Sequence, residues 1–311
     1  MDKLVKFKDN IIKNISQVIA GKEREIELLI VAFLSGGHVL LEDFPRSGKT
    51  IISKALAKTL HLQFNKMDFT SDLLVTDITG INFYNPLTGD FQFKEGPLFS
   101  NVLLIDDINR ATPKTQSVLL EAMEEKQITI DGLTRQLPLP FMVLASQSDL
   151  DTFGNFPLPQ AKLDRFFMRI KLEPMRKEEE KKTITEDSYY DLNKLKSVVN
   201  YKELLELMEA IKYIDIDERT MDYLIEIIDE TRKIKDLDLG ISPRGSINLY
   251  KASRAYAAIN GRGYIRAKDV ELMAPYVLNH IIRAKGIEGF DESTVFIKDM
   301  VSNIKAPIYD D

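Results

Sequence analysis

The segment HVLLEDFPRSGKT, residues 38–50, joins a short apolar run to a Gly-Lys-Thr triplet. The run HVLL is typical of a buried strand, and residues 49–60 are predicted to form a helix. Strand, loop, Gly-Lys-Thr and helix is the order of a P-loop, in which backbone N–H groups surround phosphate. In such a loop Lys49 would contact the β- and γ-phosphates, and Thr50 would bind Mg²⁺ through its hydroxyl.

The first position of the loop departs from the full P-loop pattern, which is a glycine, four residues and then Gly-Lys-Ser/Thr. Asp43 stands where that first glycine is expected. An acidic side chain beside a triphosphate is unfavourable unless it points away or is paired. Arg46 could be its partner or could itself contact phosphate. Taken alone, this segment is also consistent with a Gly-Lys-Thr triplet that occurs by chance at the start of a helix and binds no phosphate.

A second motif is NVLLIDDINR, residues 101–110, in which an apolar run ends in two carboxylates. Asp106 would hold Mg²⁺ directly or through water, and Asp107 would orient the attacking water. The alternative is a solvated Asp-Asp pair at a strand end. Because both motifs follow a buried-strand pattern, together they predict a site for ATP and Mg²⁺.

The apolar runs at 38–41, 102–105 and 141–144 alternate with helical patterns at 49–60 and 113–125. This alternation predicts a parallel sheet covered on both faces, the three-layer αβα core of an α/β P-loop NTPase. Residues 81–93 and 127–137 alternate apolar and polar residues around turn sequences and are predicted to be β-hairpin insertions. Two further helices are predicted over residues 1–17 and 23–34.

The character of the sequence changes after about residue 175. A highly charged stretch precedes four helical patterns, at about 201–212, 217–234, 243–260 and 267–284, with no convincing strand. We therefore predict a nucleotide-binding core over residues 1–175 and a small all-helical lid domain over residues 176–311.

The composition excludes several classes of protein. The net charge of −6 argues against a general nucleic-acid binder, which needs a basic surface. Without cysteine there is no disulfide, no thiolate zinc site and no cysteine nucleophile. The first residues lack the features of a signal peptide, and the longest apolar stretch, Leu28 to Leu34, is too short to span a bilayer. We expect a cytoplasmic protein.

Four segments occur in order along the chain: GGHVLLEDFPRSGKT, NVLLIDDINRATPKTQSVLLEAMEEKQITIDG, FPLPQAKLDRFFMRI and SPR. Over about residues 17–285 the chain resembles the MoxR group of AAA+ ATPases. The resemblance implies an αβα core with a helical lid, ATP between them, and subunits in a ring, commonly a hexamer. It also implies an ATP-driven chaperone that matures or activates other proteins, usually partners with von Willebrand factor A domains.

The resemblance assigns roles residue by residue. Lys49 and Thr50 match the P-loop pair, and Asp106 matches the magnesium-binding acid. Asp107 stands where the family has the catalytic glutamate, and Ser148 where it has the sensor asparagine. The segment VIAG, residues 18–21, would lie against the adenine. The residues expected to contact the nucleotide are Val18, Ile19, Gly21, Pro45, Arg46, Ser47, Gly48, Lys49, Thr50 and Ile51.

Two arginines match charged groups of the family. Arg165 corresponds to the arginine finger that reaches a neighbour's γ-phosphate, and Arg244 to the lid arginine that contacts the γ-phosphate of its own chain. Phosphoryl transfer depends on such positioned positive charge. The alternatives are an ion pair of Arg165 with Asp164 or Glu173, and an ordinary first-turn helix position for Arg244.

Four positions depart from the family: Asp43 and Arg46 replace glycines, Asp107 replaces glutamate and Ser148 replaces asparagine. Asp107 keeps its charge but is one methylene shorter, and a misplacement of about 1 Å can slow a reaction on the order of a hundredfold. Ser148 has a shorter reach and no amide donor. Our hypothesis is that ATP binding is kept while hydrolysis is slow or lost.

Three functions are consistent with these features. The first is an ATP-driven remodelling chaperone, and the second is a nucleotide-binding scaffold or switch with little turnover. The third, a DNA-acting motor, is disfavoured by the acidic pI of about 5.4 and by the lack of a recognisable DNA-binding motif. The first hairpin carries four aromatic residues, which either pack on the core or form a pore-facing or partner-binding loop: Phe83, Tyr84, Phe91 and Phe93.

Overall fold

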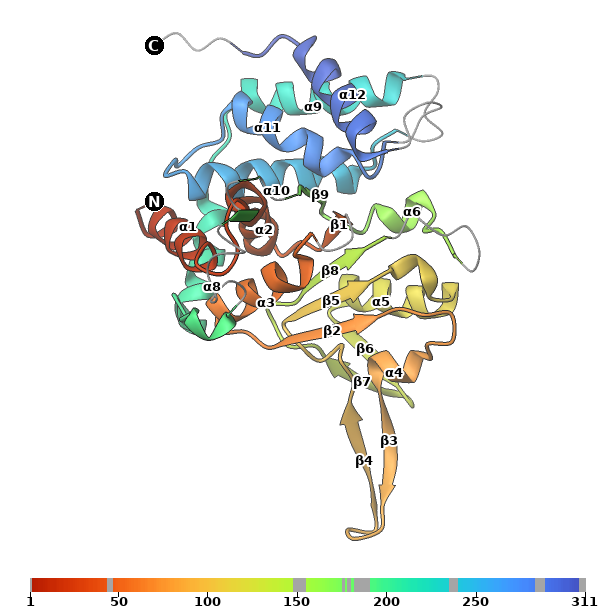
Figure 1. The fold of residues 1–311 in the computed structure, drawn as a ribbon. Coiled ribbons are helices and arrows are strands. Elements are labelled where there is room, and N and C mark those ends of the chain that lie inside the picture. The colour runs from red at the N-terminus through yellow and green to blue at the C-terminus, as the bar shows by residue number, and fades with distance from the viewer. Residues whose placement is uncertain are drawn as a thin grey trace.

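The computed structural model describes residues 2–43, 47–147, 155–174, 177, 180–181, 191–234, 240–282 and 289–307. Its centre is a five-stranded parallel sheet in the order β2-β5-β8-β1-β9 (Figure 1). The strands are β1 (Val39–Asp43), β2 (Phe64–Asp68), β5 (Val102–Asp106), β8 (Met142–Ser146) and β9 (Met168–Leu172). Because all five strands are parallel, their carboxyl ends lie at one edge of the sheet.

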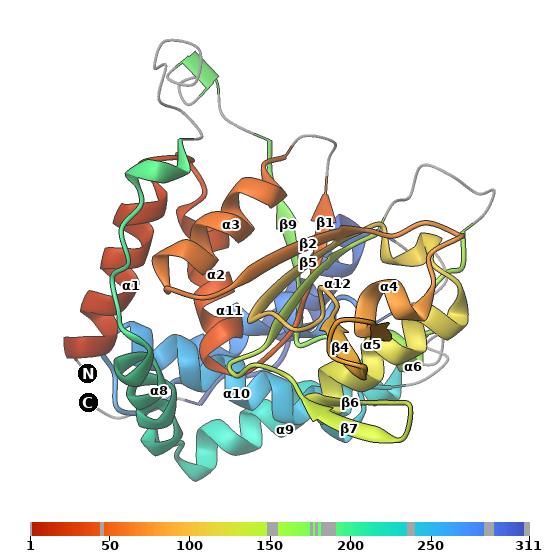
Figure 2. The ribbon, with the colours of Figure 1, turned by 90° about the horizontal axis from the view of Figure 1, so that it is seen from below.

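Successive side chains of the central strands point to opposite faces, and helices cover both. Val102 and Leu104 of β5 join one apolar cluster with α2 and α3, whereas Leu103 and Ile105 pack in another with α5. Figure 2 shows α2 and α3 on one side of the sheet and α5 on the other. The predicted three-layer αβα core is confirmed. Its helices are α1 (Asp2–Ile15), α2 (Glu23–Leu34), α3 (Lys49–Thr59), α4 (Val75–Thr79), α5 (Pro113–Glu125) and α6 (Gln160–Leu163).

The two edge strands, β2 and β9, were not predicted from the sequence. Charged residues fall within both strands: Lys66 and Asp68 in β2, and Arg169 and Lys171 in β9. Neither strand therefore shows a continuous apolar run in the sequence. Charged side chains are common on edge strands, where they discourage pairing with other chains. The three strands that were predicted include β5 and β8, in which every residue is buried.

Both predicted hairpins are present as separate two-stranded antiparallel sheets. The first pairs β3 (Gly80–Asn85) with β4 (Asp90–Glu95) and extends away from the body of the protein (Figure 1). The second pairs β6 (Gln127–Ile130) with β7 (Leu133–Gln136). Its turn residues have positive φ, as a two-residue hairpin turn requires.

The region after residue 191 is helical, as predicted. Its helices are α8 (Tyr201–Ala210), α9 (Glu218–Lys233), α10 (Pro243–Ile259), α11 (Ala267–Leu278) and α12 (Phe290–Ser302). The sequence analysis did not predict α12, and it extended α11 beyond its end at Leu278. Helix α10 contacts both α1 and α2, and one apolar cluster includes residues of all three helices. The predicted domain boundary at 175/176 lies outside the described residues.

In the described part of the chain, none of the helices combines the length and the apolar character that crossing a lipid bilayer requires.

Candidate nucleotide-binding site

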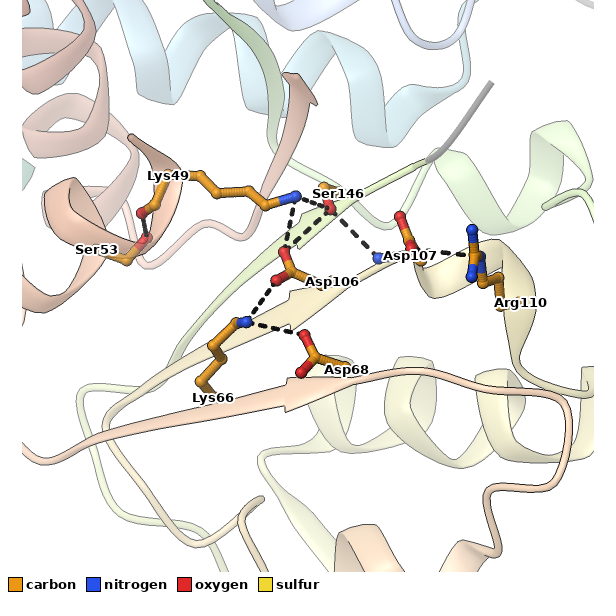
Figure 3. Close-up of polar contacts among 8 residues, drawn as sticks. All are labelled: Lys49, Ser53, Lys66, Asp68, Asp106, Asp107, Arg110 and Ser146. Carbon is orange, nitrogen blue, oxygen red and sulfur yellow. Dashed lines mark hydrogen bonds and ion pairs between the residues drawn. The ribbon is translucent and has the colours of Figure 1, made fainter. Parts of the chain in front are cut away.

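A polar cluster lies where β5 and β8 end beside the start of α3 (Figure 3). Lys49 is the first residue of α3, Asp106 the last of β5 and Ser146 the last of β8. The Nζ of Lys49 lies 2.9 Å from Oδ1 of Asp106 and donates to Oγ of Ser146 at 3.2 Å. Ser146 in turn donates to Asp106 at 3.3 Å. The fold thus joins the lysine and the acid of the two sequence motifs.

The turn before α3 requires glycine at position 48. Gly48 has a φ of +93°, and a Cβ there would lie 2.7 Å from Cδ1 of Ile19. Ile19 and Val18 are fully buried, and Ile19 packs directly against Gly48. Ser47 is buried, Thr50 and Ile51 lie in the first turn of α3, and Gly21 has a φ of +74°. The side chain of Asp43 and the residues Pro45, Arg46 and Ser148 lie outside the described part.

The carboxylate of Asp106 is flanked by two ammonium groups. Lys49 contacts Oδ1, and Lys66 of β2 contacts Oδ2, both at 2.9 Å. Burial alone raises the pKa of Asp106, but the hydrogen bonds from Lys66 and Lys49 outweigh it and hold that pKa below its usual value. The same contact, with a second one to Asp68, raises the pKa of Lys66. Asp106 is therefore ionised at neutral pH.

These residues fit ATP with Mg²⁺. The N-cap of α3, Gly48, makes no side-chain capping hydrogen bond, and the first turn carries no acidic residue. Such a helix start offers N–H groups and a positive dipole end to phosphate. No group of three or more potential metal ligands occurs among the described residues. Mg²⁺ is commonly held by one or two carboxylates together with substrate phosphates. Thr50 and Asp106 would supply the protein ligands.

Asp107 faces away from Lys49. Its backbone is left-handed, with a φ of +57°, and its N–H donates to Oγ of Ser146 at 3.3 Å. Its carboxylate lies 3.3 Å from Nε of Arg110, in the 3₁₀ turn Ile108–Arg110 that follows (Figure 3). The acid that was predicted to orient water is thus paired with a neighbouring arginine.

The sequence analysis missed three polar residues of this cluster: Ser146, Lys66 and Asp68. Lys66 bridges Asp68 and Asp106, with 2.9 Å to an oxygen of each. Asp68 lies directly opposite Asp106 in the register of β2 and β5. The sequence does carry a signal for these residues, because each lies in or at the end of a strand that pairs with β5. Using that signal requires recognising β2 as a strand.

The two arginines lie together at a different place. Arg165 follows α6, Arg244 is in the first turn of α10, and each contacts one oxygen of Glu124 near the end of α5. The Nη2 of Arg165 lies 3.3 Å from Oε2. The alternative partner Asp164 instead accepts hydrogen bonds from Ser242.

A cleft around Glu124 is lined by Gly37 and His38, which precede β1, as well as by both arginines. Lys49 follows the opposite end of β1, and five residues of strand span about 16 Å. Arg244 therefore lies at the far end of the sheet from Lys49. This position does not favour the expected contact of Arg244 with a phosphate on its own chain.

Comparisons with known proteins agree with this architecture. Residues 38–168 match the ATPase family associated with various cellular activities (AAA), and residues 229–296 match an AAA lid domain. YeaC of Bacillus subtilis is 37% identical over 96% of this chain and 94% of its own length. Chaperone MoxR1 of Mycobacterium tuberculosis is 34% identical over 86% of this chain and 73% of its own.

A crystal structure of a candidate ATPase from Cytophaga hutchinsonii superimposes with a TM-score of 0.88 at 33% identity, covering 99% of this chain and 98% of that one. Protein MoxR of Paracoccus denitrificans is 28% identical over 89% of each chain. Similarity of this extent runs through the core, the hairpins and the helical region alike. The chain belongs to the MoxR family of AAA+ ATPases.

Proposed function

We propose that the protein binds ATP with Mg²⁺ at the edge of the sheet, hydrolyses it slowly and uses it to change the state of a partner protein. The observation that carries this proposal is the cluster around Asp106, where Lys49 at the start of α3 and Lys66 share one ionised carboxylate. A helix start with a lysine, facing an acid at the end of a nearby strand, is the arrangement that phosphoryl transfer uses.

In this proposal Lys49 exchanges its contact with Asp106 for the phosphates of ATP. The exchange leaves Oδ1 of Asp106 with only the hydroxyl of Ser146 as a partner. Thr50 and Asp106 would hold Mg²⁺, which would supply positive charge to the phosphate oxygens. Lys66, anchored by Asp68, stays on Oδ2 of Asp106 and competes with Mg²⁺ for this carboxylate.

Slow hydrolysis follows from Asp107. Its carboxylate pairs with Arg110 at 3.3 Å, so it must leave that partner before it can orient a water. The side chain is also one methylene shorter than the glutamate of the family. Both features reduce the fraction of time in which a base stands at the required position.

Arg165 and Arg244 act on the nucleotide of a neighbouring subunit. Both lie at the end of the sheet opposite Lys49 and share Glu124, so they serve as a pair. A ring of subunits, which we propose to be a hexamer, places this end of one chain against the nucleotide of the next. This replaces the expectation that Arg244 acts within its own chain.

The partner is a protein, and we propose one that contains a von Willebrand factor A domain. The relative from Mycobacterium tuberculosis is named a chaperone, which supports a role in remodelling. The hairpin of β3 and β4 supplies a contact surface, since Leu87 is 94% exposed and Phe91 is 75% exposed. Apolar side chains so exposed at the end of a projecting hairpin are typical of interaction sites.

A nucleotide-held switch is the second candidate. Two features favour a switch: Asp107 is paired with Arg110, and Asp106 is paired with two lysines. Both slow ATP hydrolysis without removing the groups that bind ATP. In a switch, binding of ATP alone would change the affinity for the partner.

ATP affinity and ATP turnover, measured on one preparation, test the proposal. Wild type should bind ATP in the presence of Mg²⁺, and Lys49→Ala should abolish binding. Lys58→Ala, which removes an exposed lysine from the same helix, should bind like wild type. If Lys49→Ala binds ATP as tightly as Lys58→Ala, the proposed site is wrong. Turnover in the wild type then separates a chaperone that hydrolyses ATP from a switch.

A further inference from the structure

The cleft that contains Arg165 and Arg244 carries more positive charge than these two arginines. Its volume is about 380 Å³, and the described residues that line it include four cationic side chains and one acidic one, Glu124. The cations are Lys126, Arg165, Arg244 and Lys251. They come from the end of α5, the turn after α6 and two positions of α10. Three parts of the fold therefore bring four positive charges to one place.

Lys251 is a cation of this cleft whose surroundings disfavour its charged form. It is partly buried, and no ion pair to it occurs within the described ranges. Burial first, and then the nearby charges of Arg254 and Lys126, lower the pKa of its ammonium group. A partly buried lysine among other cations destabilises the fold unless an anion binds beside it. The one charge of Glu124 is already shared by the two arginines, each of which contacts one of its oxygens.

The spacing along α10 puts Lys251 on the same face as Arg244. Arg244, Asn248 and Lys251 line the cleft, at intervals of four and three residues, as expected for one face of a helix. Seven residues of helix place Lys251 about 10 Å from Arg244 along the axis. Their long side chains can therefore contact successive parts of one extended anion.

A triphosphate fits this arrangement better than a nucleic-acid strand does. The volume lies within the range of small-molecule sites, so it does not suit a nucleic-acid strand, which needs a continuous basic groove. The nucleotide of the same chain would lie beyond the opposite end of β1, next to Lys49. The phosphates of a nucleotide held by a second copy of this chain have the required charge and approach the arginines in the proposed ring.

We propose that Lys251 is a third phosphate-contacting residue that acts across the subunit boundary, together with Arg165 and Arg244. The inference rests on the proposed function and deepens it. Lys251 contacts the neighbour's phosphates directly, whereas Glu124 pairs the two arginines until those phosphates take its place. ATP binding in one subunit thereby strengthens the contact with the next.

The test compares Lys251→Gln with Lys298→Gln, which removes the same charge from an exposed position of α12. With ATP and Mg²⁺ present, Lys251→Gln should self-associate about tenfold more weakly and turn over ATP about tenfold more slowly than Lys298→Gln. In dilute solution the two variants should bind ATP equally. Self-association is measured by sedimentation velocity and turnover with labelled ATP in a single-turnover experiment.

Mixing the variants identifies the chain on which Lys251 acts. Lys49→Ala retains Lys251, and Lys251→Gln retains the nucleotide site, so mixed rings contain interfaces with both elements intact. The mixture should therefore turn over ATP faster than the two variants measured separately. Weaker ATP binding by dilute Lys251→Gln, without recovery on mixing, would place Lys251 on its own chain's nucleotide and overturn the inference.

The remaining outcomes separate the inference from the proposed function. If Lys251→Gln and Lys298→Gln agree in both self-association and turnover, the inference is wrong and the proposed function stands. If wild type binds no ATP, both are wrong.

Discussion

Asp106 is the central residue of the proposed nucleotide site, because it joins groups from three segments. Lys49 and Lys66 each contact one of its oxygens at 2.9 Å, and Ser146 donates a hydrogen bond to it. A carboxylate with both oxygens paired must release a partner before it can ligate a metal ion. Lys66 thus competes with Mg²⁺ for Asp106.

Replacing Lys66 by methionine should therefore favour Mg²⁺. We expect Lys66→Met to lower the Mg²⁺ concentration for half-maximal ATP binding about fivefold, since a partly exposed ion pair contributes up to about 1 kcal/mol. A fluorescence titration of Mg²⁺ at fixed ATP measures this shift. Lys94→Met, on the exposed β4 strand, is the control and should titrate like wild type. A higher Mg²⁺ requirement would mean that Lys66 contacts phosphate instead.

The sequence predicted Lys49 and Asp106 because each lies in a motif with its own strand. Ser146 and Lys66 were not predicted, because their closeness to Asp106 depends on strand order: β8 lies between β1 and β5, and β2 lies beside β5. Strand order is a non-local property that one sequence does not state. The pairing of Asp107 with Arg110 was local, three residues apart, and could have been anticipated.

Among the elements, the hairpin of β3 and β4 depends on tight backbone contacts at its base. A Cβ at Gly96 would lie 2.3 Å from the carbonyl oxygen of Ile78, next to α4. Backbone cannot move aside as a flexible side chain can, so glycine is required where the hairpin leaves the core. Turn sequences predicted both hairpins, whereas no comparable sequence pattern predicted β9 or α12.

Gly96→Ala should destabilise the protein by about 1–3 kcal/mol, the usual cost of forcing atoms into filled space. Gly263→Ala is the matched control, because a Cβ at Gly263 meets no atom within 4 Å. Urea unfolding gives the free energy of unfolding of each variant. Equal stability of the two variants would contradict the steric argument.

At the scale of the whole molecule, the two ends of the sheet carry two different clusters of charged residues. The carboxyl end of β5 holds the nucleotide cluster, and the residues before β1 line the cationic cleft. At the end of the sheet near the cationic cleft, His38 makes hydrogen bonds to two core segments, α5 and β8. Its Nε2 lies 3.0 Å from the carbonyl of Met123, and the N–H of Val143 donates to its Nδ1 at 2.9 Å. The geometry requires a neutral ring and agrees with the structural role that its place at the start of a strand suggests.

This ring makes stability depend on pH. Burial lowers the pKa of His38 from 6.5 to about 4. The unfolded chain therefore takes up the proton first, and stability is lost as the pH falls from 6.5 toward 4. At pH 5 the loss from His38 should be about 2 kcal/mol. Urea unfolding of wild type and His38→Gln at pH 7.5 and pH 5.0 measures it.

The glutamine variant should lose less stability on acidification, since its amide can make both hydrogen bonds without titrating. Burial also lowers the pKa of His280, to about 3. The loss of stability that comes from His280 therefore remains in the variant. Equal losses in wild type and His38→Gln would contradict this account.

The central claim is that this chain holds ATP through Lys49 and Asp106 and hydrolyses it slowly because Asp107 is too short and is paired with Arg110. The most direct test is the single-turnover rate of ATP hydrolysis by wild type and Asp107→Glu at saturating ATP. The account predicts unchanged ATP affinity and a rate that rises by up to about a hundredfold in Asp107→Glu. A wild type that already hydrolyses ATP as fast as Asp107→Glu would contradict it.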